Sequence, residues 1–146
     1  MRNQWKYLTA LLLVVATLCA LTAPVLAASP TTPDSPQSSA YITAVYASGS
    51  RGSTSASIYF SITATKRMSS LGATTIALYK SNGTYVAQKT YGSYPNMMGY
   101  NKTFHSDTET FYSLASGKYY AVVYFKAANS SGYDTSVYTT SYFYVG

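Results

Sequence analysis

His105 and Asp107 are the residues of this sequence that come closest to a catalytic pair, because they lie two positions apart. Side chains two apart on a strand point to the same side, so the pair and one of the many serines would supply the groups of a hydrolase triad. A serine nucleophile usually stands on a sharp Gly-x-Ser-x-Gly turn, and the sequence has no such motif. We therefore expect no catalytic residue and interpret both side chains as part of a polar strand.

Carboxylates are too few to favour a metal site or an acid pair for glycoside hydrolysis. The four are Asp34, Asp107, Glu109 and Asp134, of which only Asp107 and Glu109 are close in sequence. Calcium takes several oxygen ligands, so this pair alone is a weak candidate. A single histidine cannot provide the three or four nitrogen or sulfur ligands of zinc. The sequence predicts no metal and no cofactor, with calcium at the pair as the alternative.

Tyrosine is the residue type that remains, with 17 in the chain. Roughly four aromatic side chains fill the core of a small sandwich, so most of the tyrosines are expected at the surface. There tyrosine provides contact area and a hydroxyl at little entropic cost, as in adaptable binding surfaces. The other interpretation is that tyrosine, a good strand former, simply fills solvent-facing positions.

The first 27 residues have the pattern of an export signal. Arg2 and Lys6 precede an apolar stretch, 8–21, and small residues around Ala27 suit cleavage there. The apolar stretch is shorter than the ~20 residues of a membrane-spanning helix, so no span is expected in the mature chain. Residues 28–40 (ASPTTPDSPQSSA) contain three prolines and no large apolar side chain, which predicts a disordered lead. The domain would then cover 41–146 of a secreted, extracellular protein.

The charge distribution argues against nucleic-acid binding. Loss of Arg2 and Lys6 with the signal lowers the formal net charge from +6 to +4, and the remaining basic residues are spread along the chain. Nucleic-acid binding normally concentrates positive charge in a patch. A weak attraction to anionic wall polymers stays open. The only cysteine, Cys19, lies in the signal, so the mature domain has no disulfide.

Apolar and polar residues alternate with period two through the rest of the chain, which is typical of strands. Asn82-Gly83 predicts a two-residue hairpin turn of type I′, and 129–134 predicts a second turn. Seven strands at roughly ten-residue spacing predict an all-β, immunoglobulin-like (fibronectin-III-like) antiparallel sandwich. The predicted strands cover 41–48, 56–66, 74–80, 84–91, 100–110, 118–128 and 137–145.

Leu114, Gly117 and Tyr120 have a spacing that resembles the tyrosine corner of fibronectin-type sandwiches. The ring of Tyr120 would pack beneath the turn, and its hydroxyl would bond to backbone just upstream. The pleat would then direct Tyr119 and Phe125 to the outer side of the same strand.

The outward residues of three neighbouring strands should merge into one aromatic face on this reasoning. Its predicted members are Tyr79, Tyr119, Phe125, Tyr138, Tyr142 and Tyr144. An apolar face of this size suggests a partner, and we expect an extracellular glycan or cell-surface polymer. The alternative is a structural or matrix protein that self-associates through exposed strands.

The chain also resembles a group of small exported bacterial proteins of uncharacterised function. The resemblance extends over 41–145 and depends on two segments, the Ser-Asn-Gly hairpin with an aromatic residue, Tyr85, two positions after the glycine, and YSLASGKYYAVV at 112–123. It implies a bacterial, secreted protein with an immunoglobulin-like or fibronectin-type sandwich.

Overall fold

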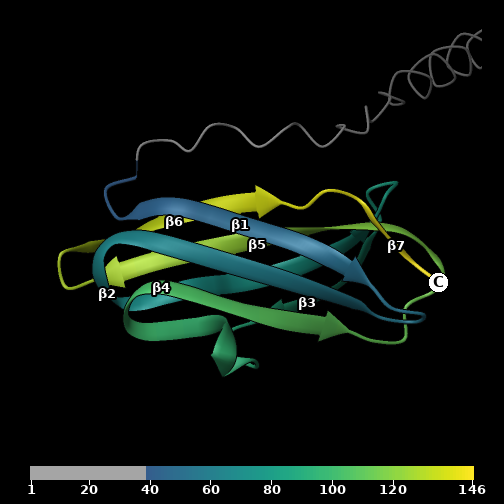
Figure 1. Cartoon of the computed structure of the whole chain (residues 1–146), viewed down its shortest axis with the longest axis horizontal. Helices are drawn as coiled ribbons and strands as arrows, with labels where there is room; N and C mark the ends of the chain where they lie inside the picture. The colour runs from purple at the N-terminus through teal and green to yellow at the C-terminus, as the bar shows by residue number, and fades with distance from the viewer. Residues whose placement is uncertain (1–38) are drawn as a thin grey trace, which may run out of the picture.

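The computed structural model describes residues 39–146 (Figure 1). The predicted export signal, 1–27, and residues 28–38 of the predicted lead lie outside the described residues. In the described part, no helix has the length and apolar character needed to cross a membrane. The elements are β1 (Ile42–Arg51), β2 (Ala56–Lys80), β3 (Tyr85–Thr90), the 3-10 turn η1 (Pro95–Met97), β4 (Met98–Phe111), β5 (Gly117–Asn129), β6 (Gly132–Thr139) and β7 (Phe143–Val145).

The seven strands form one curled sheet in which every pairing is antiparallel. The prediction of an all-β fold of about seven antiparallel strands is thereby confirmed. β2 joins the two halves of the sheet, because its first half pairs with β1 and β4, its end pairs with β3 and β5, and 70–72 between them pair with both β4 and β5. β5 pairs in turn with β6 and β7. The sheet curls until β1 lies close to β6 (Figure 1).

The core lies between the two halves of the curled sheet. Ile58 and Phe60 on the first half of β2 are fully buried, as are Ile76 and Leu78 on the second half. Phe60 meets Phe125 of β5 edge to face, with ring centroids 6.1 Å apart. The period-two pattern thus identified the buried side of β2 correctly.

β2 runs without a break through 67–73, where the sequence predicted a connection between two strands. Lys66 and Arg67 are exposed at the point where the pairing with β4 shifts register, and Met68 after them is buried. Gly72 is required further on, since a Cβ there would lie 2.2 Å from the carbonyl oxygen of Met97. The strand therefore bends from one half of the sheet into the other instead of ending.

The turn between β2 and β3 is a hairpin, but the predicted type I′ geometry is wrong. A type I′ turn needs positive φ at both central residues, and here only Gly83 has it, at 85°. The Gly83 N–H donates to the Lys80 carbonyl and the Lys80 N–H donates to the Thr84 carbonyl, each at 2.9 Å. Asn82 instead accepts the Thr84 N–H on its side chain at 3.0 Å. The loop is therefore a three-residue turn that ends in a glycine bulge.

The C-terminal segment departs from the predicted single strand, 137–145, because it is divided into β6 and β7. The predicted turn 129–134 is correspondingly shorter, since β6 already begins at Gly132. Thr140 lies buried in the break, where its N–H donates to the Ala121 carbonyl at 2.9 Å and its hydroxyl accepts the Ala121 N–H at 3.0 Å. The segment has one residue more than β5 across this break, which makes a bulge and exchanges inward and outward positions.

The start of the described chain is attached to β6 through Asp134. The Tyr41 N–H donates to the Asp134 carboxylate at 2.7 Å, and the Ser39 hydroxyl donates to the same oxygen. The Ser39 oxygen also accepts the Ile42 N–H at 2.7 Å. The hydrogen bonds from Ser39 and from the backbone of Tyr41 lower the pKa of Asp134 below its ordinary value.

Candidate functional site

Four tyrosine rings follow one another across the outer face of the sheet half made by β3, β2, β5 and the approach to β7. We call Tyr85, Tyr79, Tyr120 and Tyr142, in this order, the tyrosine path. Tyr85 and Tyr79 meet at 73° with centroids 5.8 Å apart, and Tyr79 stacks on Tyr120 at 14° and 5.3 Å. Tyr120 meets Tyr142 at 89° and 5.7 Å. All three distances lie in the range of favourable aromatic contacts.

Cross-strand register explains why these rings meet. Tyr79 of β2 is opposite Tyr85 of β3 on one side and opposite Tyr120 of β5 on the other. Directly opposed side chains on one face have Cβ atoms ~5 Å apart, which brings aromatic rings into contact. The register of the pairing between β2 and β3 shifts between Leu78 and Tyr79, and this shift sets the alignment of the two rings. Tyr142 enters from the bulge region before β7.

Lys118 extends the path at its β7 end. Its ammonium lies 4.6 Å from the ring centroid of Tyr142 and 5.7 Å from that of Tyr144. A cation over an aromatic ring is held there by the negative face of the ring. Tyr85 at the other end of the path is 53% exposed and Tyr144 beside Lys118 is 57% exposed, so the surface is open to a partner.

Tyr120 lies between Tyr79 and Tyr142 in the path. Burial raises the pKa of its phenol, and the neighbouring phenols of Tyr142 and Tyr79 raise it further. The phenol therefore stays neutral over the physiological range and keeps an O–H that can donate a hydrogen bond.

The structure corrects the predicted aromatic face at Tyr119 and Phe125. Each is only 1% exposed, and both point into the core with Ala121 and Val123 between them. The predicted phase of β5 is therefore wrong by one residue, and Tyr120 takes the outward position that the sequence assigned to Tyr119. Tyr79, Tyr142 and Tyr144 lie on the outer side as predicted, with Tyr142 and Tyr144 37% and 57% exposed.

The hydroxyl bond expected of the corner tyrosine is made by Tyr119 and not by Tyr120. The Tyr119 hydroxyl donates to the carbonyl of Ala115 at 2.7 Å, four residues upstream. Leu114 is buried beneath the same turn, and Gly117 has a φ of 155° at its end. The predicted turn is in place, and the tyrosine that closes it comes one position earlier than the spacing suggested.

The prediction placed Tyr138 on the outer face together with Tyr142 and Tyr144, and this is wrong. The bulge at Thr140 exchanges inward and outward positions between β6 and β7, so Tyr138 points to the inner side. The half-buried ring packs against the core and meets Tyr46 of β1 at a centroid distance of 5.8 Å. Tyr46 in turn meets Tyr59 of β2 at 6.3 Å. This second aromatic group lies where β1 and β6 approach, apart from the tyrosine path.

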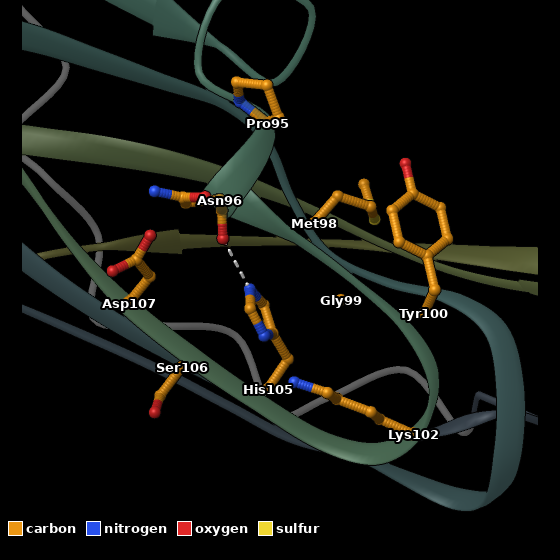
Figure 2. Close-up of a pocket in the computed structure, with 9 residues that line it drawn as sticks. All are labelled: Pro95, Asn96, Met98, Gly99, Tyr100, Lys102, His105, Ser106 and Asp107. Carbon is orange, nitrogen blue, oxygen red and sulfur yellow. Dashed lines mark hydrogen bonds between the residues drawn. The ribbon is translucent and has the colours of Figure 1, made fainter.

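His105 and Asp107 line a shallow hollow of about 580 Å³ between the η1 segment and β4, which Figure 2 shows. The His105 Nε2 is 2.9 Å from the Asn96 carbonyl oxygen, and the Asp107 carboxylate accepts the Thr108 N–H at 2.8 Å. Ser106 points away from His105 (Figure 2). The residues around the hollow thus do not form the hydrogen-bonded series of serine, histidine and aspartate that a triad needs.

Glu109, considered with Asp107 for calcium or for acid catalysis, is instead paired with Lys89. The Lys89 ammonium lies 2.7 Å from the Glu109 carboxylate, and the two side chains are 13% and 10% exposed. The same ammonium lies 3.9 Å from the ring centroid of Tyr94. A metal-binding group of three or more His, Cys, Asp or Glu side chains is not found among residues 39–146.

The sequence analysis did not assign Tyr85, Tyr120 and Lys118 to the surface that the tyrosine path forms. A usable signal was present, because Lys118, Tyr120, Tyr124 and Lys126 all have the same parity along β5. Lysines on a half-buried strand mark its solvent side, so this parity indicates the outward face.

No family model, no curated protein and no solved structure matches the chain.

Proposed function

We propose that the domain is a secreted, non-catalytic module that binds an extracellular glycan or cell-surface polymer through the tyrosine path. The observation that carries the proposal is the continuous contact of four rings across three neighbouring segments, with a lysine at one end. A sugar ring has an apolar face of C–H groups that packs on aromatic rings, and phenol hydroxyls bond its rim. Tyrosine supplies both contacts with few rotatable bonds to order.

The fibronectin-type arrangement is part of the same proposal. Pairing of β1, the first half of β2, and β4 supports one sheet, and pairing of β3, the second half of β2, β5 and β6/β7 supports the facing one. In such sandwiches these are the strands A, B, E and C′, C, F, G, with the corner tyrosine at the start of F. A bacterial origin and export are proposed as well, on the resemblance of the Ser-Asn-Gly hairpin and of 112–123 to segments of small exported bacterial proteins.

The test is a glycan array with the purified protein, followed by calorimetric titration of the glycans that bind. Tyr142→Ala is expected to weaken binding roughly tenfold, since it removes one aromatic contact. It should leave the unfolding midpoint nearly unchanged, because the ring is 37% exposed. Tyr112→Ala is the matched control, since Tyr112 is 74% exposed and outside the path. Equal affinities for the two variants would exclude the path as the binding site.

Self-association is the second candidate function, and the free edge of β4 favours it. β4 pairs only with β2 within the described residues, and Tyr100 and Phe104 on it are 61% and 50% exposed. An unpaired edge with aromatic side chains can template pairing with another copy. Light scattering over a concentration series separates the two functions, because a ligand-binding module stays monomeric and a matrix protein grows.

A further inference from the structure

A small hollow of about 160 Å³ at the end of the sheet is lined in part by Lys118, the lysine that extends the tyrosine path. The hollow lies between the β2–β3 turn and the start of β5, and its lining residues are 80–82 and 116–119. The Ser81 N–H donates to the Lys118 carbonyl at 2.8 Å and so fixes the two segments side by side. Lys118 belongs to both places, because it lines the hollow while its ammonium lies over the rings of Tyr142 and Tyr144.

The charged side chains that line this hollow are both positive. Lys80 and Lys118 line it, and neither has a carboxylate partner within salt-bridge distance, since the described residues contain only the ion pair between Lys89 and Glu109. The three described side-chain carboxylates lie elsewhere, with Asp107 and Glu109 on β4. Asp134 is paired across from Ala127, nine residues from Lys118 along β5, which is about 30 Å. A ligand on the path therefore meets positive charge and no side-chain carboxylate at this end.

We propose that the polymer bound by the tyrosine path is an acidic glycan, with a carboxylate-bearing sugar placed beside Lys118 at the end of the sheet. This inference rests on the proposed function, because the path provides the stacking contact for the neighbouring sugar. The ring stack recognises the sugar, and Lys118 selects its charge. A neutral glycan would keep the first contact and lose the second.

The experiment compares three probes by calorimetric titration of the whole protein at low salt. Trigalacturonate has sugar rings and charge, its fully methyl-esterified form has the rings without the charge, and tripolyphosphate has the charge without the rings. We expect trigalacturonate to bind at least fivefold more tightly than either of the others, since each exposed lysine–carboxylate pair contributes up to about fivefold. The advantage over the ester should shrink as salt screens the charges.

Lys118→Gln is the decisive variant and is expected to bring trigalacturonate and its ester within about twofold of each other. Lys126→Gln is the matched control, because the Lys126 ammonium also lies over a tyrosine, 4.8 Å from the centroid of Tyr133. It lies eight residues along β5 from Lys118, about 26 Å away, out of reach of a trisaccharide at the hollow. Its substitution should leave the preference intact.

Each other outcome overturns a definite part of the argument. Equal binding of trigalacturonate and its ester refutes charge selection and leaves the glycan-binding proposal in place. Binding of tripolyphosphate as tight as that of trigalacturonate shows simple charge attraction and also refutes the inference. If no probe binds and a glycan array is also negative, the proposed function fails, and the inference fails with it.

Discussion

Removal of one hydroxyl at Tyr119 tests the assignment of the tyrosine corner. Tyr119→Phe keeps the buried ring, so no cavity forms, and it deletes only the hydrogen bond of 2.7 Å to the Ala115 carbonyl. Ala115 is exposed, so the freed carbonyl regains a bond to water and avoids the penalty of a buried unsatisfied group. The expected cost is therefore the net value of one hydrogen bond, about 1 kcal/mol.

Urea denaturation at neutral pH measures this cost directly. With a slope of ~1.5 kcal/mol/M for a domain of this size, a loss of about 1 kcal/mol lowers the midpoint by roughly 0.5 to 1 M. Thermal unfolding should shift downward by about 4 °C. The slope itself should not change, because the substitution leaves the surface exposed on unfolding nearly the same.

Tyr120→Phe is the control, since it makes the same change at the next residue. The hydroxyl of Tyr120 lies on the outer face, and the described residues include no hydrogen-bond partner for it. Its removal should change the free energy of unfolding by less than about 0.5 kcal/mol, as is usual for a surface position. If Tyr120→Phe destabilises the domain as much as Tyr119→Phe, the corner assignment is refuted.

Three further substitutions test other parts of the structure. Glu109→Gln should destabilise the domain by about 3 kcal/mol in urea denaturation, because it leaves the Lys89 ammonium in a largely buried site without its counter-charge. Asp134→Asn should lose less stability than the wild type as the pH is lowered. The wild-type carboxylate contributes its full stability above the ordinary carboxyl pKa, and this contribution is lost as pH falls through the lowered pKa of the folded state. Gly49→Ala should cost ~1 to 3 kcal/mol in thermal unfolding, since its Cβ would lie 2.0 Å from the ring of Phe143.

Each of these tests has an outcome that contradicts it. If Asp134→Asn loses stability at acid pH in the same way as the wild type, the role given to the Asp134 carboxylate is refuted. Gly92→Ala places a Cβ in open space and should cost little. A wild-type-like Glu109→Gln would mean that the ion pair contributes no stability.

Strand positions were predictable because burial alternates with side-chain polarity. The phase of β5 was not, since both of its faces carry apolar side chains. Tyr119, Val123 and Phe125 occupy one parity, and Tyr120 and Val122 occupy the other. Only the lysines at the two ends of the strand distinguish these faces, and the spacing from Leu114 outweighed them in the prediction.

No pattern in the sequence predicts the bulge at Thr140. It depends on a side chain that substitutes for a backbone acceptor, which is a tertiary property of the pairing with Ala121. A run of alternating residues looks the same with or without the extra position, so a single strand, 137–145, was predicted. The tyrosine path was missed for a related reason, because cross-strand register decides which rings meet.

Tyr119 and Tyr120 are neighbours with different roles: the buried ring of Tyr119 stabilises the fold, and the ring of Tyr120 belongs to the outer surface. Adjacent residues on a strand point to opposite faces, so the ring buried at the corner directs Lys118 and Tyr120 on either side of it to the outer face. The hydroxyl bond of Tyr119 to Ala115 restrains the turn that forms one wall of the lysine-lined hollow. The corner therefore holds Tyr120 of the path and the hollow in one fixed relation, which the proposed binding of an acidic glycan requires.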